Sequence, residues 1–378
     1  MKIIYGIGLV LIFTITYLVA GKLFSSEHAS NSTSERRPES KSAHYRFLSD
    51  HDLPACQQYL TFNDNGSASQ GINKQIEACA FHFLEAEDFA SLESSMSQLR
   101  KNEIRSQSGY WLQTNFYVGL EKFLSGANDD AAFDEKDAYI RRWIEKTGGS
   151  DTAKLQLSRS MIARAAMYRG SDYANAVTDE SFEKHQVQIS KAKKFLLENE
   201  DISKRDPEWF YQMLNISNVE KNADEQKHRK LFDKAVSLYP DYYPIYLSAS
   251  EFYLEKWHGE ADSFEKFARE ATRTLGPEQA KAIYARIYRN KICGRCGDRD
   301  VRNWRNHWSD IQEGMDQVIK DFPDQWNINS YAQMACSAYE QDKTLELMKK
   351  IQGGPNPAAW TGEQFTYEYC ANWSGLSN

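Results

Sequence analysis

Apolar residues recur at helical spacing along most of the chain. In the segment 106–126 the large apolar side chains Trp111, Phe116, Leu120 and Phe123 fall near one side of a helix. The same period is present in three further segments, at 152–170, 277–290 and 304–321. Because the apolar/polar alternation of β-strands is nearly absent, the pattern predicts an all-α fold.

Successive helices joined by short turns are typical of arrays of antiparallel helix pairs. Phe232, Ala235 and Pro240 have the spacing of the closing half of a tetratricopeptide (TPR) repeat. Small residues at Ala249 and Ser250 then occur where the first helix of the next repeat would approach its neighbour closely. Further pairs are expected at 277–290 with 304–321 and at 326–338 with 342–351. We therefore predict a TPR-like α-solenoid.

The N-terminal residues 1–24 differ from this pattern. An uncharged run extends from Ile3 to Gly21 between Lys2 and Lys22. At about 1.5 Å per residue, such a helix is long enough to cross a hydrocarbon core of about 30 Å. We predict a transmembrane signal anchor, with a cleaved signal peptide as the alternative, although the apolar cores of signal peptides are shorter.

The rest of the chain divides by composition. Residues 25–43 are rich in Ser and charge and contain no large apolar side chain, so they are predicted to be a disordered stem. A helical region with degenerate repeats is expected at 44–220, and the TPR-like domain at 221–378. The net charge of −7 and the pI of about 5.7 do not favour a nucleic-acid partner.

The six cysteines fit an exported body, and an even count in an exported chain suggests disulfides. Proximity in the sequence suggests the pairs Cys56–Cys79, Cys293–Cys296 and Cys336–Cys370, whereas buried free thiols are the alternative. Cys293-Gly-Arg-Cys296 also has the spacing of a redox-active dithiol. Here it would follow a helix in an all-α chain, which favours a structural disulfide. A zinc site would need two further ligands, and Cys79 with His82 is the pair available.

The sequence Lys256-Trp257-His258-Gly259 permits two interpretations. As a binding site, Lys256 would neutralise an anion, Trp257 would stack and His258 would titrate near neutral pH. As a turn, Gly259 would supply a positive φ after a helix over 242–256, Trp257 would pack between helices, and Asp262 or Ser263 would cap the next helix. We favour the turn; His258 is the residue that neither the turn nor the packing demands.

Two motifs stand out in the segment 230–351. One is a Lys/Arg-Trp-x-Gly corner, and the other is a Trp-Asn-x-Asn segment that follows a Phe/Tyr-Pro and precedes an Ala-Cys. They correspond here to Trp257, Gly259, Pro323, Trp326, Asn327, Asn329 and Cys336. With these motifs the segment resembles a mostly bacterial family, domain of unknown function 4034. The resemblance implies a TPR-like fold and a body held outside the cytoplasm, in the periplasm at a bacterial inner membrane, and it supplies no activity. The alternative is a secreted or soluble periplasmic protein. Cys293 and Cys296 lie in an insertion that the family does not share.

Enzyme motifs are not evident. The sequence has no His-Glu-x-x-His helix, no Gly-x-Ser-x-Gly elbow and no phosphate-binding Gly-x-x-x-x-Gly-Lys loop. Asp298-Arg299-Asp300, with the anchor and stem, is similar to type II membrane glycosyltransferases, but these enzymes need an α/β nucleotide-binding sheet.

We therefore predict a non-catalytic, membrane-anchored, extracytoplasmic scaffold or peptide-binding module that uses the concave face of the array. Its partners would be an unknown protein or peptide and, through the N-terminal helix, the inner membrane. We expect no cofactor and no metal. A thiol–disulfide redox protein that uses Cys293 and Cys296 is the alternative.

Overall fold

The computed structural model describes residues 45–60, 68–170, 177–292, 301, 303–360 and 364–376. Within these ranges the chain is helical, and its β-type pairing is limited to isolated bridges of Arg105 with Phe47 and with Trp111. The all-α prediction is confirmed. The predicted anchor and stem, residues 1–43, lie outside the described residues, and no described helix combines the length and apolarity needed to span a bilayer.

The helices begin and end as follows over the described ranges. The α-helices are α1 (Ala68–Glu85), α2 (Phe89–Asn102), α3 (Leu112–Glu121), α4 (Asp130–Lys146), α5 (Asp151–Arg169), α6 (Asp179–Glu198), α7 (Glu208–Val219), α8 (Glu225–Leu238), α9 (Tyr243–Phe252), α10 (Ser263–Ala271), α11 (Pro277–Lys291), α12 (Trp308–Asp321), α13 (Gln325–Ser337), α14 (Gln341–Met348) and α15 (Tyr367–Ser374). Short 3₁₀ helices are η1 (Pro54–Tyr59), η2 (Lys122–Leu124), η4 (Glu200–Lys204) and η5 (Trp304–His307).

Local side-chain chemistry sets many of these boundaries. Asp129 and Ser150 accept hydrogen bonds from the backbone N–H groups of Ala132 and Ala153, which would otherwise be unpaired at the starts of α4 and α5. Pro277 occupies the first turn of α11, where its missing N–H costs nothing. Gly170 ends α5 with φ of 70°, a conformation that glycine adopts most readily. The ends predicted at Pro277 and Gly170 are confirmed.

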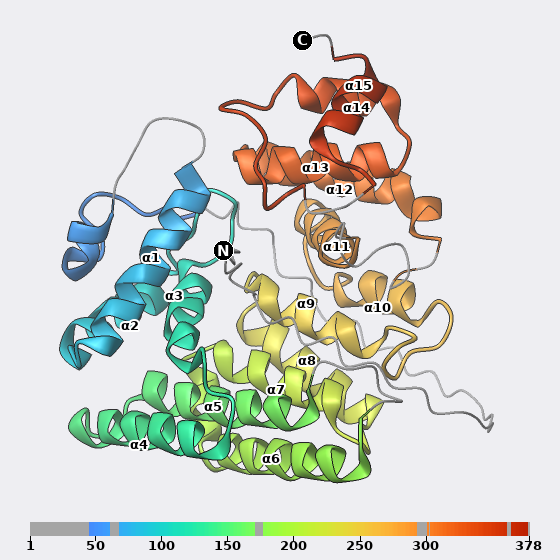
Figure 1. Cartoon of the computed structure of the whole chain (residues 1–378). Helices are drawn as coiled ribbons and strands as arrows, with labels where there is room; N and C mark the ends of the chain where they lie inside the picture. The colour runs from blue at the N-terminus through green and yellow to red at the C-terminus, as the bar shows by residue number, and fades with distance from the viewer. Residues whose placement is uncertain are drawn as a thin grey trace, which may run out of the picture.

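The helices stack as successive pairs, an arrangement consistent with an α-solenoid. α5 packs along α6, α11 along α12 and α13 along α14, while α7 contacts α9 and α9 contacts α11. Figure 1 shows the chain passing from α1–α3 through α4–α6 and α7–α9 to α11–α15. One hydrophobic core extends through the stack and crosses the predicted boundary at 220/221, where α7 packs on α8 and α9.

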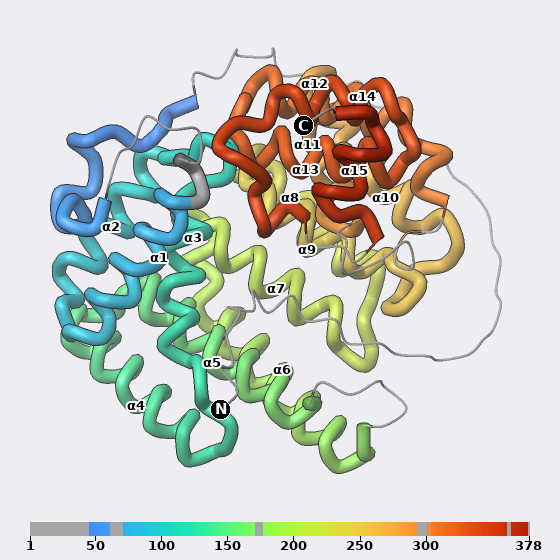
Figure 2. The backbone as a smooth tube through the Cα atoms, turned by 45° about the horizontal axis from the view of Figure 1, so that its top comes forward, coloured from blue at the N-terminus to red at the C-terminus, as the bar shows by residue number. Residues whose placement is uncertain are grey.

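The first and last parts of the stack touch each other, as the two views together show (Figures 1 and 2). α1 contacts α13, and the ring of Tyr45 lies 4.8 Å from that of Phe322. In the loop before α3, the backbone oxygen of Ser108 accepts hydrogen bonds from Arg286 Nη2 at 2.8 Å and from Asn327 Nδ2 at 3.2 Å. The array therefore curves back on itself, and the loop 104–111 bridges its two ends.

Two disulfides fasten the extremities of the described fold. Cys56–Cys79 joins η1 to α1, and Cys336–Cys370 joins α13 to α15. All four of these cysteines are fully buried. Pairing by sequence proximity is thus confirmed for these two bridges, whereas Cys293 and Cys296 lie outside the described residues.

Candidate functional site

The corner at 256–259 is a turn, but not of the predicted kind. α9 ends at Phe252 rather than at residue 256. Gly259 is not among the residues with positive φ, so that prediction is wrong. A Cβ atom on Gly259 would instead lie 2.0 Å from the backbone oxygen of Tyr253. Glycine is needed here because two stretches of backbone approach closely. Asp262 takes the N-cap position of α10, but its side chain makes no capping hydrogen bond.

The predicted binding residues of this corner separate in the structure. Trp257 is buried and packs into the core, while Lys256 is partly exposed. Although much of His258 is exposed, its Nε2 lies 3.0 Å from the backbone oxygen of Asn218 and its ring lies 4.5 Å from that of Phe252. Packing and hydrogen bonding therefore do involve His258. Of the three residues, Trp257 alone lines the cavity described below.

The other residues that carry the family resemblance lie in α13 or just before it. Pro323 lies between α12 and α13. Asn329 is fully buried in α13, and its Oδ1 accepts hydrogen bonds from the backbone N–H of Asn356 at 3.0 Å and from Trp360 Nε1 at 2.8 Å. It thereby fixes the segment after α14. Trp326 lies against the guanidinium of Arg289, 5.4 Å from ring centroid to Cζ.

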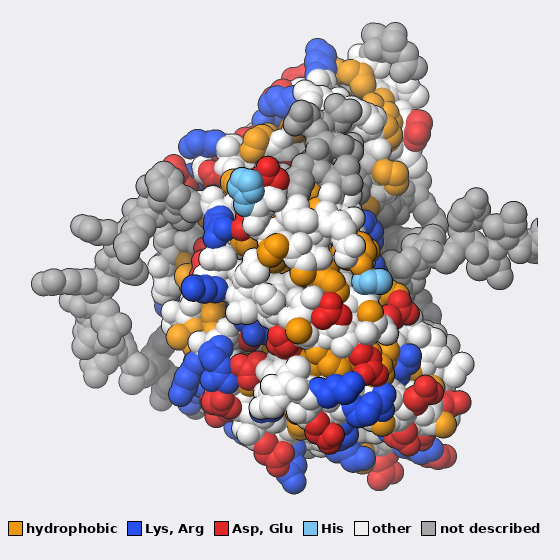
Figure 3. Space-filling view, turned by 90° about the vertical axis from the view of Figure 1, so that its left-hand side faces the viewer, with side chains coloured by type: hydrophobic (Ala, Val, Ile, Leu, Met, Phe, Trp, Pro, Cys, Tyr) orange, Lys and Arg blue, Asp and Glu red, His pale blue; other side chains and the backbone are white. Residues whose placement is uncertain are grey.

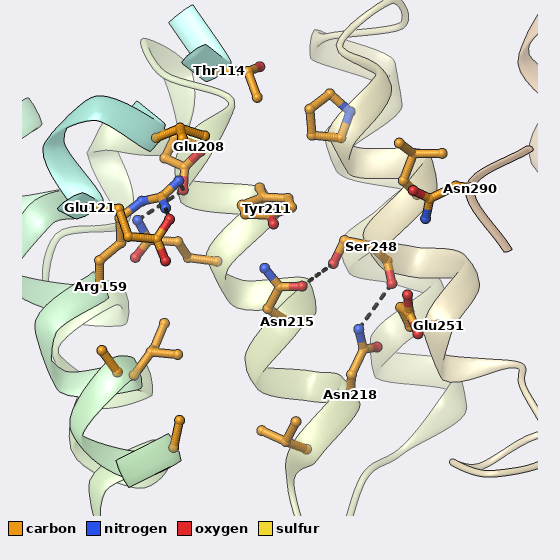
Figure 4. Close-up of a pocket in the computed structure, with 18 of the residues that line it drawn as sticks. Thr114, Glu121, Arg159, Glu208, Tyr211, Asn215, Asn218, Ser248, Glu251 and Asn290 are labelled. Atoms are coloured by element: carbon orange, nitrogen blue, oxygen red, sulfur yellow. Dashed lines mark hydrogen bonds and ion pairs between the residues drawn. The ribbon is translucent and has the colours of Figure 1, made fainter. Parts of the chain in front are cut away.

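The described part of the fold contains a partly open cavity of about 260 Å³, here called the inner cavity, between alternate helices of the stack. Its walls come mainly from α3, α5, α7 and α9, with contributions from α6 and from the end of α11 (Figure 4). Apolar side chains form much of the lining: Val118, Ile162, Ala163, Ala166, Ile189, Val219, Pro244 and Leu247. Such an apolar enclosure with a few placed polar groups is typical of a ligand site.

An ion-paired cluster lies at one end of the inner cavity (Figure 4). Arg159 Nη2 lies 2.7 Å from Glu208 Oε1, and its Nη1 lies 2.9 Å from Glu121 Oε2. Gln212 Nε2 donates to Glu208 Oε1 at 3.1 Å. Burial raises the pKa of Glu208 to about 7, although the charge of Arg159 opposes this rise. Burial also lowers the pKa of Arg159, but the charges of Glu208 and Glu121 outweigh it, so the guanidinium stays charged.

Amide and hydroxyl groups occupy the opposite side, on α7 and α9 (Figure 4). Ser248 Oγ donates to Asn215 Oδ1 at 2.7 Å, and Asn218 Nδ2 donates to the backbone oxygen of Ser248 at 3.0 Å. Several buried polar atoms of lining residues have no partner among the described residues: Asn218 Oδ1, Gln212 Oε1, His185 Nε2, Glu251 Oε2 and Trp257 Nε1. Because buried polar atoms are nearly always hydrogen-bonded, these atoms mark positions that a polar ligand can satisfy.

One feature of the sequence, the spacing of polar residues in α7, indicates this site without any enzyme motif. Within the apolar helix α7, polar residues recur at Glu208, Gln212, Asn215 and Asn218. This spacing of three or four residues places them on one face of the helix. A polar stripe in an otherwise buried helix indicates a shared polar surface, here the inner cavity. Arg159 gives no comparable signal, since it is the single polar residue that α5 contributes to the lining.

Among the described residues, few side chains are available for metal or redox chemistry. Cys79 is bonded to Cys56, so the proposed pairing of Cys79 with His82 as zinc ligands does not exist. Over the described ranges, no group of three or more His, Cys, Asp or Glu side chains has an arrangement suited to a metal ion. The sequences Cys293–Cys296 and Asp298–Asp300 lie outside the described residues.

The exposed face formed by the N-terminal helices carries charges of both signs side by side (Figure 3). Lys146 pairs with Glu87, and Arg164 lies 2.7 Å from Asp134 and 3.3 Å from Asp137. Interspersed charges of this kind do not form the continuous basic surface that a nucleic-acid backbone requires.

Comparisons with models of protein families, with curated proteins and with solved structures give no match. The described residues contain helices and isolated bridges but no β-sheet, the scaffold that the glycosyltransferase alternative requires.

Proposed function

We propose that this protein is a non-catalytic binding module that holds a short extended segment of a partner protein in its inner cavity. The observation that carries this proposal is the set of unpaired hydrogen-bonding atoms on Gln212, Asn218 and Trp257, side by side with apolar walls. Each peptide unit offers one N–H donor and one C=O acceptor. The unpaired amide oxygens of Gln212 and Asn218 can accept from N–H groups of the segment, and the indole N–H of Trp257 can donate to a C=O. The apolar wall can receive a side chain of the segment.

The ion-paired end of the cavity favours binding over catalysis. The two carboxylates that line this end, Glu208 and Glu121, are both engaged with Arg159. A general base must be free to accept a proton from a substrate. We therefore assign Arg159 and its partners to the architecture of the cavity rather than to chemistry.

The TPR-like character of the array is part of the proposal. Phe232 and Ala235 of α8 are buried, as are Ala249 and Ser250 of α9, in agreement with their expected roles in packing repeat against repeat. Small residues also permit close approach between α11 and α12, where a Cβ atom on Gly314 would lie 2.2 Å from the backbone oxygen of Lys281. In such arrays the inner helices form the binding surface. The relationship to domain of unknown function 4034 remains a proposal of the same kind.

The location is proposed from the disulfides. Cys56–Cys79 and Cys336–Cys370 favour an oxidising compartment, since disulfides are rare in reducing cytosol. We propose a body in the periplasm, tethered to the inner membrane by residues 1–24. A secreted or soluble periplasmic form is the alternative.

Site-specific photo-crosslinking in intact membranes tests the proposed function. A photoreactive residue replaces Leu247, which lines the inner cavity, or, as a control, Leu197, which is 48% exposed and does not line the cavity. We expect adducts from position 247 that map to one extended segment of a partner, and none of that segment from position 197. Ala163→Phe, which fills the cavity, should remove the adduct while the chain stays folded. Absence of any adduct at position 247 would refute the proposal.

A further inference from the structure

A second, smaller cavity of about 80 Å³, here called the arginine pocket, adjoins the inner cavity. Tyr110 and Asn290 line both cavities. The arginine pocket lies between α11, α12 and α13, and its polar lining consists of Arg286, Arg289, Asn290, Asn327 and Ser330. A water molecule occupies about 30 Å³ in the liquid, so the pocket has room for a small polyatomic group but not for a large one.

Two arginines line this small space, and neither has a carboxylate partner in the described part of the chain. Arg286 is 5% exposed. Its Nη2 donates to the backbone oxygen of Ser108, and it forms no ion pair with the described residues. Arg289 Nη2 donates to Ser330 Oγ at 3.1 Å, and this guanidinium likewise has no described carboxylate partner. The Nε atoms of both arginines are buried and unpaired.

Three other arginines near the inner cavity are paired with carboxylates. Arg100 lies 2.5 Å from Asp206, Arg105 lies 2.6 Å from Asp241, and Arg159 contacts Glu121 and Glu208. Buried charges in proteins are normally paired in this way because desolvation is costly. Arg286 and Arg289 differ from these three arginines, because neither has a carboxylate partner among the described residues.

Aromatic rings account for part of the stabilisation of these cations. The Cζ atom of Arg286 lies 4.6 Å from the centroid of the Tyr243 ring and 5.2 Å from that of Tyr110. Arg289 has Trp326 beside it. Such contacts contribute about 1–2 kcal/mol each, less than the cost of burying an unpaired charge. In agreement with this, burial lowers the pKa of Arg289 below its usual value.

We infer that Arg286 and Arg289 form a binding site for one small oxyanion, a carboxylate or a phosphate. Their guanidinium N–H groups supply charge-assisted donors, the hydroxyl of Ser330 can add another, and Asn290 can donate from its side-chain amide. The source of the oxyanion is either a free ion or an acidic group of the molecule held in the neighbouring inner cavity. The site does not depend on the identity proposed for that molecule.

The test is thermal unfolding of the full-length protein in detergent, with inorganic phosphate, acetate or chloride added at equal ionic strength. We expect the unfolding temperature to rise steadily with the logarithm of the phosphate or acetate concentration above its dissociation constant, and not with chloride, since a ligand of the folded state at free concentration c stabilises it by RT ln(1 + c/Kd). A response to phosphate alone indicates a tetrahedral dianion, and a response to acetate alone a carboxylate group. Equal curves in all three salts would overturn the inference.

Substitutions in the arginine pocket test whether the stabilisation by anions arises there. Arg289→Gln should weaken the apparent affinity at least tenfold, whereas Arg269→Gln, at a side chain that is 52% exposed, should leave it unchanged. If Arg289→Gln does not fold, Ser330→Ala keeps both guanidinium groups and should weaken the affinity a few fold. Full affinity in a folded Arg289→Gln or Ser330→Ala protein would contradict the assignment. Ala163→Phe, which blocks the inner cavity, should retain the anion response, so failure of the peptide proposal and failure of this inference are distinguishable.

Discussion

Arg159 Nη2 lies 2.7 Å from Glu208 Oε1 within the inner cavity, and through this contact α5 is joined to α7. The other terminal nitrogen of Arg159 contacts Glu121, at the end of α3. One guanidinium thus ties three successive inner helices together. The same side chain lies 5.2 Å from the ring of Tyr117, so it is enclosed on several sides. The cavity wall is therefore fixed by charge as well as by apolar packing.

Glu208→Ala should destabilise the fold substantially. Removal of one partner of a buried ion pair typically costs about 3–5 kcal/mol, because the remaining charge is left uncompensated. Glu121 still contacts Arg159, so we expect a loss near the lower end, roughly 3 kcal/mol. Chemical denaturation measures it, with Glu180→Ala as control, since Glu180 forms an exposed pair with Lys184. A loss below 1 kcal/mol would show that the pair is not a structural tie.

The buried side chain of His228 should make the fold less stable at acid pH. Burial lowers the pKa of His228 to about 4, and its two ring nitrogens contact Ser217 Oγ at 3.0 Å and the backbone oxygen of Ala249 at 3.2 Å. The unfolded chain binds this proton more tightly than the folded chain does. Neutral His228 therefore contributes fully to the free energy of unfolding above pH 6.5. This contribution is lost as the pH falls toward 4, by up to about 3 kcal/mol.

Denaturation at several pH values checks this prediction. His228→Gln should flatten the loss of stability between pH 6.5 and 4. It should not abolish the loss, because burial also lowers the pKa of His185 and of His258. Glu208→Gln should make the loss of stability between pH 6.5 and 4 steeper. The raised pKa of Glu208 means that the folded chain gains stability as the pH falls from 7 through 4.5, and the variant lacks this opposing contribution. Identical profiles for all three proteins would contradict the assignment.

Gly259→Ala tests the close contact in the corner. The added methyl group would lie 2.0 Å from the backbone oxygen of Tyr253, so one of the two backbone stretches must move. We expect a loss of about 1–3 kcal/mol. Gly71→Ala is the matched control, because its Cβ meets nothing within 4 Å inside α1 and alanine favours helix. The interpretation fails if Gly259→Ala is as stable as Gly71→Ala.

These examples show which features a single sequence can predict. The pattern predicted α5, α11 and α13 closely, because apolar periodicity, Pro277 and Gly170 are local signals that lie within the helices themselves. Cys56–Cys79 and Cys336–Cys370 followed from proximity, since helices that are neighbours in a stack are also neighbours in sequence.

The cavity could not be predicted in the same way. It is formed by residues from Tyr110 to Asn290 that meet only when the stack curves. The polar stripe of α7 was visible, but periodicity alone does not tell whether such a stripe faces solvent or a cavity. The corner at 256–259 shows the opposite error, because residues that are adjacent in sequence need not share a site. Lys256, Trp257 and His258 are adjacent in sequence and have side chains that often bind ligands, yet only Trp257 lines the inner cavity.

Trp257→Phe distinguishes binding from packing at this corner. Trp257 Nε1 is buried without a partner and lines the inner cavity. If the indole N–H donates to a bound segment, Phe should lower affinity about tenfold, because one hydrogen bond contributes about 1–1.5 kcal/mol. The free energy of unfolding should also fall, because Phe is smaller than the buried Trp side chain and leaves a void in the core. Trp308→Phe is the matched control: its Nε1 is also buried and unpaired, but it does not line the cavity. Yield of the adduct at position 247 as a function of partner concentration gives the affinity. Equal affinity of the two variants would mean that Trp257 serves packing alone.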